Sequence, residues 1–246
     1  MNLRYKLVLA GVSCLIIWKL LGYSSRQTGP DLAVLEKEAD KVSAVETSSS
    51  SSTAKEKVAI AVFYETLCPD SRGFFINQLL PTLERAPDII DVTLVPYGKA
   101  VSMVDGNSYK FSCQHGPLEC HGNRVHACAT KYVLDQLTLV RYTTCMISDN
   151  VDPEDAGKRC ARSLGIDWDP IVACSRKEEG IQLLAKMGEA THKLNPPVTF
   201  IPTIEVNKSL GYQASLLKRL LEELCTRFKV VPEPCKGIST VAFHRL

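Results

Sequence analysis

The sequence lacks an excess of charge of either sign. It contains 29 Lys and Arg against 27 Asp and Glu, which leaves a net charge of +2 over 246 residues. A chain so close to neutral generates no strong field to attract nucleic acid or anionic membranes. Its basic residues also form no stripe interleaved with aromatic ones. We therefore expect no nucleic-acid partner.

A long hydrophobic run near the start is missing as well. The apolar run at residues 7–18 follows Arg4 and Lys6 and ends at Lys19, so it is shorter than the roughly 20 residues that a bilayer-spanning helix needs. This pattern is typical of a secretory signal peptide. No A-x-A-like cleavage site follows, so a signal anchor with Lys19 reaching the membrane surface is the alternative. Both interpretations place the remaining chain in an oxidising lumen and limit membrane contact to this segment.

The next segment, residues 24–57, is poor in aromatic side chains and contains a serine run at 48–52. Such a composition buries too little apolar surface to offset the entropy lost on ordering. The sequence thus predicts four parts: a signal peptide or signal anchor at 1–23, a serine-rich flexible linker at 24–57, a folded domain at 58–235 and a C-terminal tail at 236–246.

The folded part lacks an even number of cysteines. Of the ten in the chain, Cys14 lies in the targeting segment, and nine remain. In a lumenal protein an odd count indicates a free thiol or an intermolecular bridge. We expect Cys68 to be the free and solvent-accessible one. The other eight suit four structural disulfides, in a pairing that spacing does not determine: Cys113, Cys120, Cys128, Cys145, Cys160, Cys174, Cys225 and Cys235.

Zinc ligation is the alternative for some of these cysteines, because residues 113–128 hold three Cys and three His. Structural zinc sites usually show C-x2-4-C knuckles. The gaps between cysteines here are six and seven residues, so disulfides are favoured. We expect no metal and no cofactor.

Hydrophobic patterning predicts an α/β domain. Residues 58–64 form an apolar, β-branched run that suits a strand buried on both faces. A helix is predicted at 74–85, kinked by Pro81, and a second strand at 89–95.

The middle of the chain, residues 101–192, shows no clear strand and carries helical patterning together with six of the cysteines. Strand composition returns at 198–206, and an amphipathic helix is predicted at 216–228. This order predicts a thioredoxin-like fold with a mostly helical, disulfide-rich insertion.

Cys68 lies where the first strand meets the following helix, in the sequence C-P-D-S. The first N–H groups and the positive dipole end of a helix stabilise a thiolate, the form that attacks disulfides, whereas Asp70 opposes it. Ser71 occupies the position of the second cysteine of a C-x-x-C redox motif. The alternative interpretation of Cys68 is a buried structural cysteine or a disulfide partner.

Pro202 interrupts the strand run at 198–206. A cis bond between Ile201 and Pro202 explains a proline at this place. In thioredoxin-like proteins such a proline packs beside the reactive sulfur. The alternative is an ordinary trans proline on an edge strand.

The segment CQHGPLECHGNRVHAC at 113–128 resembles the CQHGxxECxxNxxxxC motif of the gamma-interferon-inducible lysosomal thiol reductase family. The resemblance extends more weakly over about 58–235. It implies a thioredoxin-like fold, reduction of protein disulfides in acidic endolysosomal compartments, and a lumenal glycoprotein. Cys68 matches the first active-site cysteine of this family and Pro202 its cis proline, whereas Ser71 replaces the second cysteine.

A hydroxyl cannot resolve a mixed disulfide. We therefore expect monothiol exchange or isomerisation of disulfide-bonded protein substrates, with release by a small thiol such as glutathione or cysteine. The expected location is the secretory pathway, in a lysosome or endosome, or outside the cell. Asn207 begins a glycosylation sequon, Asn-Lys-Ser. Two other functions compete: a non-catalytic, chaperone-like domain that binds clients, and a purely structural secreted domain.

Overall fold

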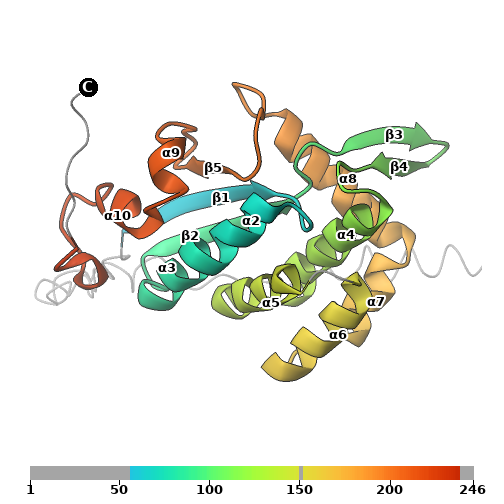
Figure 1. Cartoon of the computed structure of the whole chain (residues 1–246), viewed down its shortest axis with the longest axis horizontal. Coiled ribbons are helices and arrows are strands. Elements are labelled where there is room, and N and C mark those ends of the chain that lie inside the picture. The colour runs from blue at the N-terminus through green and yellow to red at the C-terminus, as the bar shows by residue number, and fades with distance from the viewer. Residues whose placement is uncertain (1–55, 150–151, 239–246) are drawn as a thin grey trace, which may run out of the picture. The chain divides into compact units, whose positions relative to one another are not determined.

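A computed structural model describes residues 56–149 and 152–238 (Figure 1). Its central sheet has the strand order β2-β1-β5, formed by β1 (Val58–Tyr64), β2 (Ile90–Pro96) and β5 (Thr203–Val206). Strands β1 and β2 are parallel, and β5 runs antiparallel to β1. The predicted strand, helix, strand opening is therefore confirmed, and β5 brings the C-terminal part of the chain to the strand that precedes Cys68.

The helical connection from β1 to β2 begins at Pro69, directly after Cys68. It comprises α2 (Pro69–Phe74), a π-helical turn η2 (Phe75–Leu79) and α3 (Leu80–Arg85). The π turn ends two residues before Pro81, which has no N–H to donate to the carbonyl four residues back. The interruption expected from this proline thus takes the form of a widened turn.

The mostly helical insertion is confirmed. It contains α4 (Pro117–Tyr132), α5 (Gln136–Ser148), α6 (Pro153–Leu164), α7 (Asp169–Ser175) and α8 (Glu178–His192). In Figure 1 these helices gather at the side of the sheet away from α10.

The expectation of no strand between 101 and 192 is wrong. A hairpin of β3 (Val101–Asp105) and β4 (Ser108–Ser112) stands at the start of the insertion. Its turn is made by Gly106, which adopts a left-handed φ of 62° that glycine tolerates without strain. The two residues between the strands, Gly106 and Asn107, form a Gly-Asn pair between two short runs of β-branched and aromatic residues. This is a hairpin signal, and it was present in the sequence.

Two C-terminal predictions need correction. Strand β5 begins only at Thr203 rather than at 198, since the proline at 202 cannot donate to a sheet ladder. The helix expected at 216–228 is replaced by α9 (Gln213–Leu216) and α10 (Leu220–Cys225), followed by the 3-10 turn η3 (Glu233–Cys235). The N–H of Leu220, the first residue of α10, donates to Gln78 Oε1 at 3.1 Å. A tertiary contact therefore interrupts the helix that the amphipathic pattern predicts.

The core covers both faces of β1. Val62 and Tyr64 belong to the main cluster, which includes apolar residues of α2 to α5 and α10. Ala61 and Phe63 point to the other face, where they meet apolar residues of α8. Burial on both faces therefore holds for the end of β1 that leads to Cys68, while Ala59 near its start is exposed.

In the described part of the chain, no helix has the length and apolar character needed to cross a membrane. The predicted signal segment at 1–23 and nearly all of the linker at 24–57 lie outside the described residues, as do residues 239–246 of the tail.

Candidate active site

Cys68 is the residue that caps the N-terminus of α2. Its backbone is extended (φ −68°, ψ 123°), and its carbonyl accepts the Arg72 N–H at 3.0 Å. Pro69 takes the first helical position, where a missing N–H costs nothing. Cys68 is the free cysteine among the described residues, yet only 8% of it is exposed. The expectation of a solvent-accessible thiol is therefore wrong.

The Ile201–Pro202 peptide bond is cis. The Cys68 Sγ lies 3.9 Å from the Ile201 carbonyl oxygen, within the range of a weak sulfur hydrogen bond. Thr203, the first residue of β5, pairs with Phe63 on β1. The antiparallel pairing of β5 with β1 thus places the cis proline turn beside the thiol.

Ser71 is fully buried one helical turn after Cys68. Its Oγ accepts the Glu65 N–H at 3.3 Å, so the hydroxyl faces back toward the end of β1. The described residues contain no second sulfur in the C-x-x-S segment.

An open groove of about 480 Å³ begins at α2 and extends to the cis proline turn. Its walls include Phe74, Phe200 and Ile201, and the rim carries Asp70 and Lys218. Because Phe200 is 40% exposed, an extended polypeptide can contact apolar surface here.

Helix α4 supports the segment that leads to Cys68. The backbone N–H and the hydroxyl of Thr66 both donate to Asn123 Oδ1, each at 3.0 Å. The Tyr64 hydroxyl lies 2.9 Å from His126 Nδ1. A Cβ at Gly122 would come within 2.6 Å of the Thr66 Oγ1, so the helix approaches this segment as closely as only glycine permits.

Part of the chain matches a known protein family. Residues 59–164 match the model of a family described as gamma interferon inducible lysosomal thiol reductase. A related protein of this type from Anopheles gambiae is 34% identical over 199 residues, which cover 74% of this chain and 81% of the relative. The chain belongs to this thiol reductase family.

Two further relatives carry the family name. GILT-like protein 1 of Drosophila melanogaster is 38% identical over 62% of this chain, and the match spans 66% of that relative's length. The gamma-interferon-inducible lysosomal thiol reductase of Mus musculus is 30% identical over 74% of this chain and 73% of its own.

Solved structures with a similar arrangement include DsbA of Chlamydia trachomatis. It has a TM-score of 0.49 and 14% identity, and covers 71% of this chain and 90% of that one. Oxidised BdbD of Bacillus subtilis has a TM-score of 0.46 and 17% identity, over 68% and 85%. Membership of this family assigns the chain to the thiol-disulfide oxidoreductases.

Among the described residues there are four disulfides, which use all eight cysteines named above. They are Cys113–Cys120, Cys128–Cys174, Cys145–Cys160 and Cys225–Cys235. Three lie within the insertion and one fastens α10 to η3. Because all eight sulfurs are oxidised, the cysteines at 113, 120 and 128 offer no thiolate to zinc.

Two ionisable groups of the family motif at 113–128, His115 and Glu119, lie beside Glu65, and the sequence did not predict this cluster. His115 Nδ1 lies 2.6 Å from Glu119 Oε2 and 3.6 Å from Glu65 Oε2. Glu65 Oε1 accepts the Lys99 N–H at 2.7 Å. Burial raises the pKa of Glu65 and the Glu119 carboxylate adds to the rise, against the lowering effect of the Lys99 hydrogen bond. The sequence contained one signal for this cluster: His115 and Glu119 are four residues apart, a spacing at which side chains on a helix meet.

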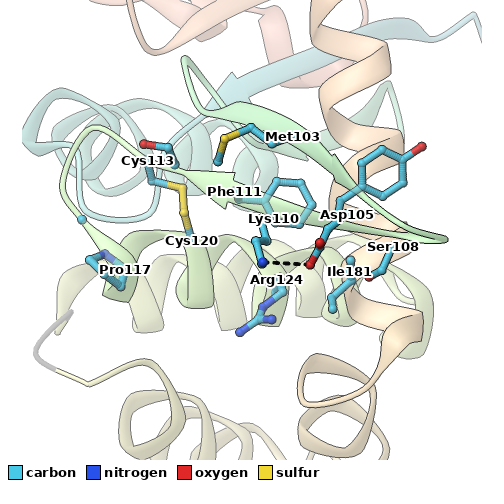
Figure 2. Close-up of a pocket in the computed structure, with 13 residues that line it drawn as sticks. Met103, Asp105, Ser108, Lys110, Phe111, Cys113, Pro117, Cys120, Arg124 and Ile181 are labelled. Atoms are coloured by element: carbon cyan, nitrogen blue, oxygen red, sulfur yellow. Dashed lines mark ion pairs between the residues drawn. A yellow bond between two sulfur atoms is a disulfide. The ribbon is translucent and has the colours of Figure 1, made fainter.

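A second hollow, of about 650 Å³, lies between the β3–β4 hairpin and the start of α4 (Figure 2). The Cys113–Cys120 disulfide and Arg124 line it, and the Lys110–Asp105 ion pair, 2.9 Å long, lies within it. This hollow shares no lining residue with the groove beside Cys68, so it is separate from the candidate active site.

Asn207 is exposed in the turn after β5, with a left-handed φ of 47°. Its Oδ1 accepts the Ala59 N–H at 3.0 Å. Since a glycan attaches to the side-chain nitrogen, this hydrogen bond is compatible with glycosylation.

Proposed function

We propose that the protein exchanges disulfides of protein substrates in an endolysosomal or secretory lumen, with Cys68 as a monothiol nucleophile. The observation that carries the proposal is the free Cys68 at the start of α2, 3.9 Å from the carbonyl that precedes cis Pro202. The groove beside it offers an apolar surface for an extended substrate.

The exchange forms a mixed disulfide and then resolves it with two small thiols. The Cys68 thiolate attacks one sulfur of a substrate disulfide, so that a mixed disulfide forms and the other substrate sulfur leaves as a thiolate. A small thiol such as glutathione or cysteine then attacks the Cys68 sulfur and releases the reduced substrate. A second small thiol frees Cys68, and the two small thiols supply both electrons as their own disulfide.

Isomerisation is the second outcome of the same chemistry. When a thiol of the substrate itself attacks the mixed disulfide, Cys68 is released and no net oxidation or reduction occurs. The buried Ser71 hydroxyl, held by the Glu65 N–H, takes part in neither step as a nucleophile.

The test is to trap the mixed disulfide with a disulfide-bonded protein at acidic and at neutral pH, using non-reducing gels and mass spectrometry. Wild-type protein should accumulate the adduct, and turnover should rise with glutathione concentration. Cys68→Ala should form no adduct. Ser71→Cys should shorten the adduct's lifetime and reduce the need for glutathione. Ser71→Ala, the matched control, should keep the adduct lifetime of wild type, while its stability falls because the buried Glu65 N–H loses its acceptor.

A client-binding module is the competing function, because Ser71 leaves no resolving thiol. Absence of any adduct at both pH values, combined with unchanged client binding by Cys68→Ala, would establish that alternative in place of the proposal.

A further inference from the structure

Three side chains from two distant segments converge next to the reactive segment. Glu65 follows the last residue of β1, while His115 and Glu119 lie in the short loop and first helical turn enclosed by the Cys113–Cys120 disulfide. One ligand-type atom from each residue lies within 4.8 Å of the other two. The disulfide and the start of α4 therefore hold the His115 imidazole and the Glu119 carboxylate opposite the Glu65 carboxylate.

The two carboxylates are withdrawn from water. Glu65 is 1% exposed and Glu119 is fully buried, whereas 38% of the His115 side chain is exposed. Glu65 Oε2 is buried without a hydrogen-bond partner and lies 3.6 Å from His115 Nδ1, on the side facing the cluster. A buried carboxylate oxygen with no donor is costly unless a cation or a proton neutralises it.

The geometry points to a divalent transition-metal site formed by Glu65, His115 and Glu119, which zinc fits best. Three protein ligands of imidazole and carboxylate type leave a fourth position open toward solvent through the exposed His115. Two carboxylates and a neutral imidazole neutralise a 2+ ion. Magnesium and calcium prefer all-oxygen sets, so the histidine selects against them.

The two distances from His115 suit this assignment after a small adjustment, and all three ligand atoms lie within 4.8 Å of one another. In tetrahedral zinc sites the bond lengths of about 2.0–2.2 Å place neighbouring ligand atoms roughly 3.4 Å apart. The His115–Glu65 distance of 3.6 Å is already close to this value. The 2.6 Å contact between His115 and Glu119 is a hydrogen bond that the metal would replace, and the half-exposed imidazole can rotate to do so.

The test uses the folded protein purified without chelator and then dialysed against Zn²⁺. Elemental analysis after gel filtration should find one zinc ion per chain, and a chromophoric chelator should measure its affinity. Co²⁺ serves as the optical probe, because its visible absorption reports coordination geometry and the presence of sulfur ligands. We expect a tetrahedral spectrum without a thiolate band.

The variants distinguish this site from other metal-binding groups. Glu65→Gln keeps the side-chain volume and the acceptor for the Lys99 N–H, and it should lower zinc affinity by more than the roughly 10- to 100-fold expected for loss of an outer partner. His115→Ala should do the same. His121→Ala, from the same motif but paired with Glu154, and Cys68→Ser should both retain the ion.

Zinc should also raise the thermal unfolding temperature of wild type and of His121→Ala, but not of Glu65→Gln. Equal zinc content in wild type and in a folded Glu65→Gln variant would overturn the proposal. So would wild-type protein that binds no zinc, which would indicate that a shared proton neutralises the cluster. Neither result depends on whether Cys68 reacts with disulfides.

Discussion

Two neighbouring faces of α4 are attached to the rest of the protein by different means. One face, made of Glu119, Asn123 and His126 at spacings of four and three residues, contacts the end of β1 and the segment before Cys68 through hydrogen bonds. The next face carries Cys120 and Cys128, which are tied by disulfides to the preceding loop and to α7.

The two kinds of attachment differ: the disulfides are permanent, whereas the hydrogen bonds can adjust. Disulfides restrict the unfolded chain and hold in an oxidising lumen, but a sulfur pair next to the thiol at Cys68 would be open to exchange with it. The hydrogen-bonded face positions the reactive segment without placing a second sulfur in contact with it. We expect the two faces to respond differently to substitution, reduction and pH.

The largest loss should follow removal of the Cys128–Cys174 bond, whose cysteines are 46 residues apart in the sequence. The loop-entropy relation gives about 4 kcal/mol for a loop of this length. Denaturant unfolding of the double Cys→Ala variant measures the loss. A free energy of unfolding equal to that of wild type would show that the unfolded state is not restricted by this bond.

Asn123→Ala should cost about 2–3 kcal/mol, because it leaves the buried Thr66 N–H without an acceptor. The same variant should slow formation of the Cys68 adduct, since Thr66 positions the reactive segment. Asn77→Ala, on the exposed side of the helix after Cys68, is the control for stability and should stay within about 0.5 kcal/mol of wild type.

Removal of the Cys113–Cys120 bond should cost less, about 2 kcal/mol, because its cysteines are only seven residues apart. The double Cys→Ala variant is compared with the Cys128–Cys174 variant by the same denaturant titration. A larger loss than for the longer loop would contradict the entropic explanation and would assign the bond a role in holding His115 and Glu119.

The effect that is smallest over a single pH unit concerns acid, and it arises at His126 on the hydrogen-bonded face. Burial lowers the pKa of His126 from 6.5 to about 3. Between these values the unfolded state binds a proton that the folded state does not, so stability falls as pH drops from 6.5 toward 3, by about 1.4 kcal/mol per pH unit.

His126→Asn provides the comparison for this pH effect, because its amide oxygen can still accept from the Tyr64 hydroxyl but does not titrate. Unfolding free energies of both proteins are measured across this pH range. Parallel curves for wild type and variant would show that His126 does not contribute to acid sensitivity.

Local patterns predicted much of the fold. Short stretches of sequence predict three features, because their causes are local: the strand before Cys68, the helical insertion, and Pro202 at the head of a strand. The break between α9 and α10 is different, since it depends on Gln78, which is distant in the sequence. The hairpin at 101–112 was legible from Gly106 and Asn107, but its runs are short.

The candidate site was only partly predictable. Cys68, Ser71 and Pro202 were named from sequence, whereas the pairing of eight cysteines is one of 105 arrangements that spacing does not distinguish. Glu65 gave no signal, because it meets His115 and Glu119 only after β1 and α4 have packed together. The expectation of no metal rested on cysteine spacing, and it did not consider carboxylates from another segment.

If Cys68 is the nucleophile proposed above, its low exposure has a consequence for which clients react. With 8% of the residue exposed and the Ile201 carbonyl beside the sulfur, a disulfide must protrude from its own chain to make contact. Compact proteins whose disulfides do not protrude from the surface would not react, whereas a chain that has opened locally would be attacked. The rate for each client would then follow its own opening equilibrium, and the protein would discriminate by conformational state more than by sequence.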